Sequence, residues 1–255
     1  MLLPLSECET IRVMTTETEK SIPRTARERA RAEITREILD VALHHLATDG
    51  APALSLRAIA RDLGMASSAV YRYVASRDEL LTRLIIDAYN SLGEAAEAAE
   101  ARADRSDLIG RWSAICTAVR SWAIANPNRY ALIYGSPVPG YVAPPDTVAP
   151  GSRVAALLTR ILVDATASGH LPAEITSDLV SPAASEALAP LREFVGSDVS
   201  DALIQRGLIA WTGLYGAVSF ELFGQLHNVI GEGPGEREAW FEECIRRWAT
   251  QVGIA

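Results

Sequence analysis

The chain has few lysines and cysteines and no long apolar run. A single lysine stands against 23 arginines, so coding bias explains the arginine abundance and arginine content alone indicates little about function. The cysteines at 8, 116 and 244 are odd in number and far apart, which excludes a disulfide framework and a zinc-ligand spacing. No apolar run reaches 18 residues, so we expect no membrane-spanning segment.

The opening segment, MLLPLSECETIRV, has a short apolar stretch and acidic flanks, which argues against a secretory signal. We therefore expect a cytoplasmic protein, in keeping with the cysteine usage. Apolar residues make up 49% of the 255 residues, which is enough for a buried core.

Motifs for catalysis are also missing. None of the four histidines has a cysteine, histidine or carboxylate at metal-ligand spacing. The chain contains no G-x-S-x-G, no G-x-G-x-x-G and no P-loop. We therefore expect neither an enzyme nor a bound metal or cofactor.

What is present begins with residues 54–79, LSLRAIARDLGMASSAVYRYVASRDE, which predict two short helices meeting at Gly64. An apolar stripe at helical spacing marks the first helix at Leu56, Ile59, Ala60 and Leu63. Gly64 tolerates the left-handed conformation that ends a helix, and the small Ala60 lets a second helix cross closely. This layout is typical of a helix-turn-helix that reads DNA, although an ordinary helical hairpin gives the same pattern.

The second helix, predicted over residues 67–74, buries Val70 and part of Tyr73 and Val74. Its outward side chains can read a DNA groove or bind phosphates, and they are Ser67, Ser68, Tyr71 and Arg72. The S-x-x-E pattern of Ser76 and Glu79 is a capping box that starts a further helix.

Upstream, an apolar stripe from Ile34 to Leu46 predicts a longer helix that ends near Gly50. The arginines before it, from Arg24 to Arg31, form either a basic arm for the minor groove or a solvated helix start. Three helices therefore form one small domain, followed at once by a fourth helix.

Charge is distributed unevenly along the chain, whose net charge is −8. Residues 20–83 hold 11 Lys+Arg and 8 Asp+Glu, whereas residues 84–255 hold 12 and 20. A small basic module on an acidic body would direct its basic face toward phosphates, although chance variation in surface charge gives a similar split.

The remainder of the chain is predicted to be helical, with no useful β-alternation. The expected helices cover residues 76–103, 106–126, 127–134, 152–167, 199–230 and 236–252, with shorter pieces over 170–199. The proline-rich segment 136–151 is expected to lack regular structure. We divide the chain into a flexible tail (1–23), a DNA-binding domain (24–75) and a helical regulatory domain (76–255).

A concave site for a small molecule combines apolar walls with a few polar groups, and aromatic residues of the regulatory domain offer both. The candidate ligand-binding residues are Trp112, Ile115, Val119, Tyr130, Tyr134, Trp211, Tyr215 and Glu221. Aromatic residues at helical spacing also serve as plain core. Glu221 stands inside an apolar helix, where a buried carboxylate requires a partner from the protein or a ligand.

Residues 27–82 resemble the DNA-binding domain of the TetR family of one-component bacterial repressors. The run GMASSAVYRYVASRDELL, residues 64–81, carries the resemblance, with Tyr73 where many members have histidine. Two further segments, residues 126–141 and 211–221, are similar to a subgroup with a Trp- and Gly-marked ligand domain. The resemblance implies phosphate contacts from Ser55, Tyr71, Tyr73 and Arg77, and base contacts from Arg57, Ser67, Ser68 and Arg72.

Small residues on the helix over 199–230 let another helix approach closely, either within the chain or from a second copy. The resemblance implies a homodimer. We place its interface on Gly213, Gly216, Ala217, Phe220, Gly224, Phe241, Ile245 and Trp248.

The sequence therefore predicts an all-α protein with an N-terminal three-helix helix-turn-helix domain and a larger helical domain for ligand binding and dimerisation. We expect a ligand-responsive repressor that binds a palindromic double-stranded DNA operator as a homodimer, with a small apolar effector ligand. The alternative is an all-α enzyme or carrier of an apolar small molecule with no DNA binding.

Overall fold

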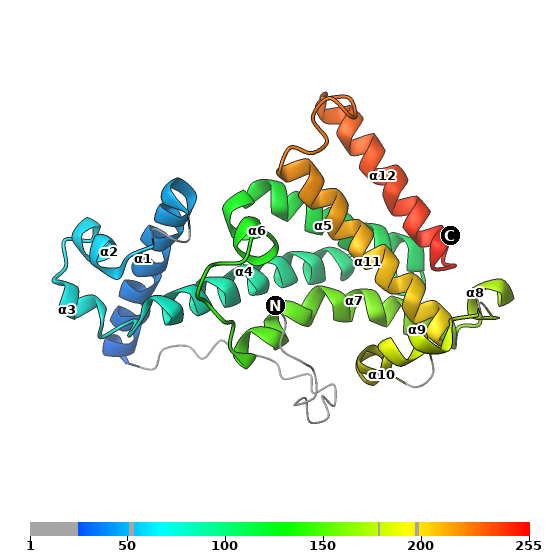
Figure 1. Cartoon of the computed structure of the whole chain (residues 1–255), viewed down its shortest axis with the longest axis horizontal. Helices are drawn as coiled ribbons and strands as arrows, with labels where there is room; N and C mark the ends of the chain where they lie inside the picture. The colour runs from blue at the N-terminus through cyan, green and yellow to red at the C-terminus, as the bar shows by residue number, and fades with distance from the viewer. Residues whose placement is uncertain (1–24, 51–53, 178, 197–198) are drawn as a thin grey trace. The chain divides into compact units, whose positions relative to one another are not determined.

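A computed structural model describes residues 25–50, 54–177, 179–196 and 199–255 of the chain. The tail predicted over residues 1–23, and Arg24 after it, lie outside these residues. Every regular element within the described ranges is helical (Figure 1), which confirms the all-α prediction.

The helices follow one another along the chain as α1 (Ala26–Asp49), α2 (Leu56–Asp62), α3 (Ser67–Val70), α4 (Arg77–Glu100), α5 (Leu108–Ala125), α6 (Pro127–Tyr134), η3 (Pro145–Thr147), α7 (Val148–Ala167), α8 (Ala173–Ser177), α9 (Pro182–Ala187), α10 (Ala189–Val195), α11 (Asp201–Leu222) and α12 (Pro234–Gln251). They belong to two compact units. The first unit contains the described residues up to 89 together with 126–150, and the second contains 90–125 and the described residues from 151 to 255.

The core of the first unit is built by α1, α2, α3 and the start of α4. The predicted stripe of α1 is buried at Ile38, Ala42 and Leu46. Fully burying a leucine or isoleucine side chain stabilises a fold by about 1.5–3 kcal/mol, so these positions hold the unit together. The segment 126–150 adds Leu132, Val138 and Tyr141 to the same core.

Packing divides the chain differently from the predicted domains. Leu80, Leu81 and Leu84 of α4 belong to the core of the first unit. The Tyr141 hydroxyl lies 2.8 Å from the Thr82 hydroxyl, so segment 126–150 is also hydrogen-bonded to α4. The boundary at residue 75 stays a prediction about function, while the compact unit extends beyond it.

The second unit is organised around α5, which contacts both α11 and α12. Ile115, Cys116 and Val119 of α5 have no exposed surface. The chain reverses after α11, so that α12 packs back against α11 and α5 (Figure 1). On α7 the predicted apolar stripe from Val154 to Ala165 is buried.

Several predicted helix boundaries are wrong. Helix α7 begins at Val148 instead of residue 152, because Pro150 falls in the first turn, where its missing N–H costs no hydrogen bond. Asp107, not Ser106, caps α5 by accepting the Gly110 N–H at 2.8 Å. Helix α11 ends at Leu222, whereas the sequence placed the end of this helix near residue 230.

Candidate functional site

The turn between α2 and α3 has the geometry that the sequence predicted. Gly64 has a φ of 64°, in the left-handed region. The Met65 N–H donates to the Ala60 carbonyl at 2.8 Å, and the Gly64 N–H donates to the Arg61 carbonyl at 3.1 Å. These two bonds satisfy the last carbonyls of α2 and turn the chain sharply into α3.

The second helix of the motif is shorter than the predicted span of 67–74. Helix α3 covers Ser67–Val70, and the chain then continues in a tighter turn. There the Tyr73 N–H donates to the Val70 carbonyl at 2.9 Å, and the Val74 N–H to the same carbonyl at 3.1 Å. Val70 and Val74 are fully buried, so they anchor α3 and this turn on the core.

The predicted DNA-binding residues divide by exposure. Those that face solvent are Arg57, Ser67, Ser68, Tyr71 and Arg72. Tyr71 is 46% exposed, which is unusual for a residue with a large aromatic ring. Its hydroxyl can reach a phosphate. Ser55, Tyr73 and Arg77 are partly buried and lie at the edges of this surface.

Arg31 contacts the end of the segment predicted as the second helix of the motif, residues 67–74, a role that the sequence did not reveal. Its guanidinium lies 5.3 Å from the centre of the Tyr73 ring, and its Nη2 donates to the Arg72 carbonyl at 3.0 Å. Arg31 belongs to α1, so the expected basic arm is helix from residue 26 onward. A capping box formed by Thr25 and Glu28 starts that helix.

The start of α4 is fixed by Ser76 and Glu79, as the S-x-x-E pattern predicted. Ser76 Oγ accepts the Glu79 N–H at 3.0 Å, and the Glu79 carboxylate accepts the Ala75 N–H at 2.7 Å. The hydrogen bond from Ala75 and the contact with Arg83 lower the pKa of Glu79, although burial acts in the opposite direction. This cap ties α4 to the segment that follows α3.

The predicted ligand-binding residues are divided between the two units. Tyr130 and Tyr134 belong to the first unit, where their rings lie 5.1 Å apart and the Tyr134 ring contacts Tyr89. In the second unit, Ile115 and Val119 are fully buried core. The Trp211 and Tyr215 rings lie 5.3 Å apart on α11.

A cavity of about 150 Å³ opens within the second unit among α5, α7, α10 and α11. Two predicted residues, Trp112 and Trp211, line it. The sequence did not identify the other lining residues, which are Ala155, Leu158, Thr159, Leu162, Leu191, Phe194, Val195, Ile204, Gly207 and Leu208. A usable signal was Gly207, a helical glycine whose missing side chain leaves room beside Leu162.

Glu221 has its partner within the protein. Arg120 of α5 donates to the two carboxylate oxygens at 2.6 and 2.7 Å. The Glu221 side chain is 7% exposed and that of Arg120 14%. These hydrogen bonds raise the pKa of Arg120 despite its burial. Glu221 thus joins α11 to α5, and no lone charge is left for a ligand.

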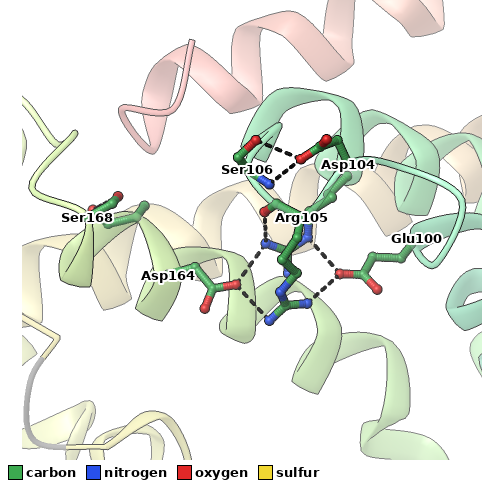
Figure 2. A network of polar contacts seen from close by, with 8 residues as sticks. Glu100, Asp104, Arg105, Ser106, Asp164 and Ser168 are labelled. Carbon is green, nitrogen blue, oxygen red and sulfur yellow. Dashed lines mark hydrogen bonds and ion pairs between the residues drawn. The ribbon is translucent and has the colours of Figure 1, made fainter.

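A second ionic cluster joins the end of α4, α5 and α7. Arg111 is fully buried and donates to Glu100 at 2.7 Å and to Asp164 at 2.7 Å. Figure 2 shows Arg105 reaching the same two carboxylates, at 3.2 and 3.0 Å. Burial lowers the pKa of Arg111, but the hydrogen bonds to Asp164 and Glu100 outweigh it and raise the pKa.

The predicted dimer residues also fall into two groups. Phe241 and Ile245 are 2% and 3% exposed within the chain, so they have almost no surface left for a second copy. A Cβ on Gly213 would lie 2.7 Å from the Trp248 indole nitrogen, which shows that this glycine serves the α11–α12 contact. Gly224 has a φ of 82° and follows the end of α11, so it terminates the helix.

The exposed surface of that set lies on α11 and directly after its end. Phe220 is 54% exposed, and a Cβ on Gly216 would meet nothing within 4 Å. Ile209 and Phe223, at 46% and 43% exposed, extend this apolar surface along the helix. We call Ile209, Gly216, Phe220 and Phe223 the α11 surface.

No helix of the described residues is long and apolar enough to cross a membrane. The same part of the chain contains no group of three or more side chains placed to hold a metal ion.

Two family models match the chain. The model for bacterial regulatory proteins of the tetR family matches residues 38–84, and that for the tetracyclin repressor-like C-terminal domain matches residues 112–248. Among solved structures, the putative regulatory protein SCO4313 is similar with a TM-score of 0.71 and 36% identity, covering 89% of this chain and 100% of that one.

Curated relatives are regulators as well. The HTH-type transcriptional regulator Rv1816 of Mycobacterium tuberculosis (strain ATCC 25618 / H37Rv) is 44% identical over 218 residues, which is 82% of this chain and 89% of that protein. The regulator Mb1846 of Mycobacterium bovis (strain ATCC BAA-935 / AF2122/97) matches equally. The chain therefore belongs to the TetR family of transcriptional regulators.

Proposed function

We propose that the chain is a repressor that binds a palindromic operator as a homodimer and leaves it when a small apolar ligand binds. The observation that carries the DNA-binding part is the surface of α3. Val70 is fully buried, while Ser67, Ser68 and Arg72 around it face solvent. A helix anchored in this way can present its polar side chains to the major groove.

Gel retardation with DNA flanking the gene tests operator binding. Arg72→Ala should relax specificity at one or two base pairs, at a cost of about 1–3 kcal/mol. Arg77→Ala should weaken binding to all sequences and lower the salt slope by about one unit. Arg160→Ala, which removes an exposed arginine of α7, is the control and should change neither. If no flanking DNA is retarded, the all-α carrier becomes the better reading.

The homodimer is supported by the α11 surface. A recognition helix reads only a few base pairs, so affinity for a palindrome requires two-fold pairing. Gly216→Trp introduces a bulky group where the chain itself leaves open space, so it should disrupt pairing without disturbing the protomer. Gly235→Trp, also at an open glycine, is the control. An unchanged dimer of Gly216→Trp in sedimentation would exclude this surface.

The ligand part is supported by the cavity in the second unit. Apolar walls with few polar groups are typical of small-molecule sites. Compounds that raise the thermal midpoint of the protein should be tested for release of retarded DNA, because a ligand can shift an equilibrium only by its differential affinity for two states. Stabilising compounds that leave operator binding unchanged would contradict ligand-responsive repression.

A further inference from the structure

One side chain of α1 makes two contacts with the segment that follows α3. The Arg31 Nη2 donates to the Arg72 carbonyl at 3.0 Å, and the guanidinium lies over the Tyr73 ring, 5.3 Å from its centre. The first contact restrains the backbone at Arg72, and the second places a cation against the next side chain, at a distance where the two attract. Both contacts join residues of the first unit.

The segment that Arg31 contacts has little structure of its own. Helix α3 is a single turn, Ser67–Val70, and no side chain caps its start. Isolated helices this short are unstable in water, because forming the first turn fixes several residues for one hydrogen bond. Val70 and Val74 anchor the apolar side of the segment in the core. Arg31 adds an anchor between these two valines, at a residue whose own side chain faces solvent.

The two contacts require an arginine. A guanidinium is planar and carries its N–H donors in that plane, so it can donate to a carbonyl while it lies over an aromatic ring. The ammonium of a lysine is a point charge on a flexible stem, and it cannot present a donor edge and a flat face at the same time. Arg31 therefore restrains both Arg72 and Tyr73, which a lysine at this position would do poorly.

A restraint on the Arg72 backbone matters most for reading bases. Hydrogen bonds to a base edge require a fixed geometry, and Arg72 is predicted to make such contacts. A segment that is already in its bound conformation also loses less freedom when it binds. Non-specific attraction to phosphates depends on charge and not on this geometry. The contacts of Arg31 should therefore affect specific binding and leave non-specific binding unchanged.

We infer that Arg31 is a positioning residue for base recognition by Arg72, and that Arg31 itself binds no phosphate. The inference rests on the proposed function and names a residue outside the helix-turn-helix motif on which base reading depends. Loss of the two contacts should lower the affinity for the preferred DNA sequence by about three- to tenfold.

The experiment compares specific with non-specific binding. Duplexes that the wild-type protein selects from a random-sequence pool supply the preferred sequence, and a shuffled duplex of the same composition reports non-specific binding. Gel retardation at several salt concentrations gives the specificity ratio, which is the affinity for the preferred duplex divided by that for the shuffled one, and the salt slope. Arg31→Met and Arg31→Lys should both lower the specificity ratio and keep the wild-type slope. Arg36→Met, which removes an exposed arginine of the same helix, is the matched control and should not change the ratio.

A second comparison tests whether the effect passes through Arg72. In the Arg72→Ala background, Arg31→Met should cause no further loss of specificity, because the side chain that it positions is gone. In the wild-type background, Arg31→Met should relax the same base pairs as Arg72→Ala. A residue that only stabilised the fold would instead weaken binding equally in both backgrounds.

Four results would each overturn the inference. They are a wild-type specificity ratio for Arg31→Met, a salt slope that falls by about one unit, as loss of a phosphate contact predicts, a ratio restored by Arg31→Lys, and losses of Arg31→Met and Arg72→Ala that add. Any of these, obtained with a preferred sequence in hand, leaves the proposed function intact. A selection that yields no preferred sequence would overturn the proposed function, and this inference with it.

Discussion

Replacing Glu221 with glutamine should destabilise the second unit by about 2–3 kcal/mol. Removing one partner of a buried ion pair typically costs about 3–5 kcal/mol, because the other charge remains without compensation. Glutamine keeps one oxygen that can accept from Arg120, so the loss is smaller than for alanine. Both side chains are sufficiently buried, at 7% and 14% exposed, for this magnitude to apply.

Thermal unfolding measures the effect. For 150–250 residues a change of 1 kcal/mol shifts the midpoint by about 2–4 °C, so Glu221→Gln should lower it by roughly 4–12 °C. Glu243→Gln is the matched control. Glu243 also accepts from two arginines, at 2.6 and 2.8 Å, but these side chains are exposed to solvent on the surface of α12. We therefore expect no measurable change in the thermal midpoint of this variant.

A double variant tests whether the uncompensated charge is the cause. Arg120→Met combined with Glu221→Leu removes both charges, and it should recover much of the stability that Glu221→Gln loses. The reasoning is refuted if Glu221→Gln melts like the wild type. It is refuted equally if the double variant is no more stable than Glu221→Gln.

The remaining predictions concern two glycines and one cap. Gly213→Ala should lower the thermal midpoint, because its Cβ would lie 2.7 Å from the Trp248 indole nitrogen. Gly216→Ala should raise the midpoint, because alanine stabilises a helix by about 0.5–1 kcal/mol relative to glycine and the added Cβ meets no neighbour within 4 Å. The reverse order of the two midpoints would contradict the packing of α11. Glu79 has a lowered pKa in the folded chain, so its contribution should be present above the ordinary value of 4.5 and lost as the pH falls through the lowered value. Thermal midpoints of wild type and Glu79→Gln should therefore differ at pH 7 and converge in acid, and a constant difference would contradict the assignment.

The sequence predicted the first unit well because its signals are local. A left-handed glycine, an apolar stripe and an S-x-x-E cap each act within a few residues, and Gly64 and Ser76 have the roles expected of them. The contact of Arg31 with Tyr73 was missed because it joins residues far apart in the chain. Its residues carry no pattern that distinguishes them from other exposed arginines and tyrosines.

The cavity could not be predicted for a related reason. Trp112 and Trp211 were identified as aromatic residues, but α10 and its Phe194 come from a proline-interrupted stretch without periodicity. The dimer interface stays a prediction, and the sequence could not tell which of its residues pack within the protomer, because small residues permit close approach without saying which helix approaches. Gly213 and Phe241 are used within the chain, whereas Phe220 on α11 and Gly224 just after this helix are exposed.

Electrostatic pairing explains how the helices of the second unit find their register around α5. This helix contains Arg111 and Arg120 but no aspartate or glutamate, so both charges must find carboxylates on other helices. The two arginines are about 2.5 turns apart and therefore project from opposite faces of the helix. Arg111 binds the end of α4 and α7, while Arg120 binds α11. Sliding α5 by one turn would break both sets of hydrogen bonds at once, which apolar packing alone would not prevent.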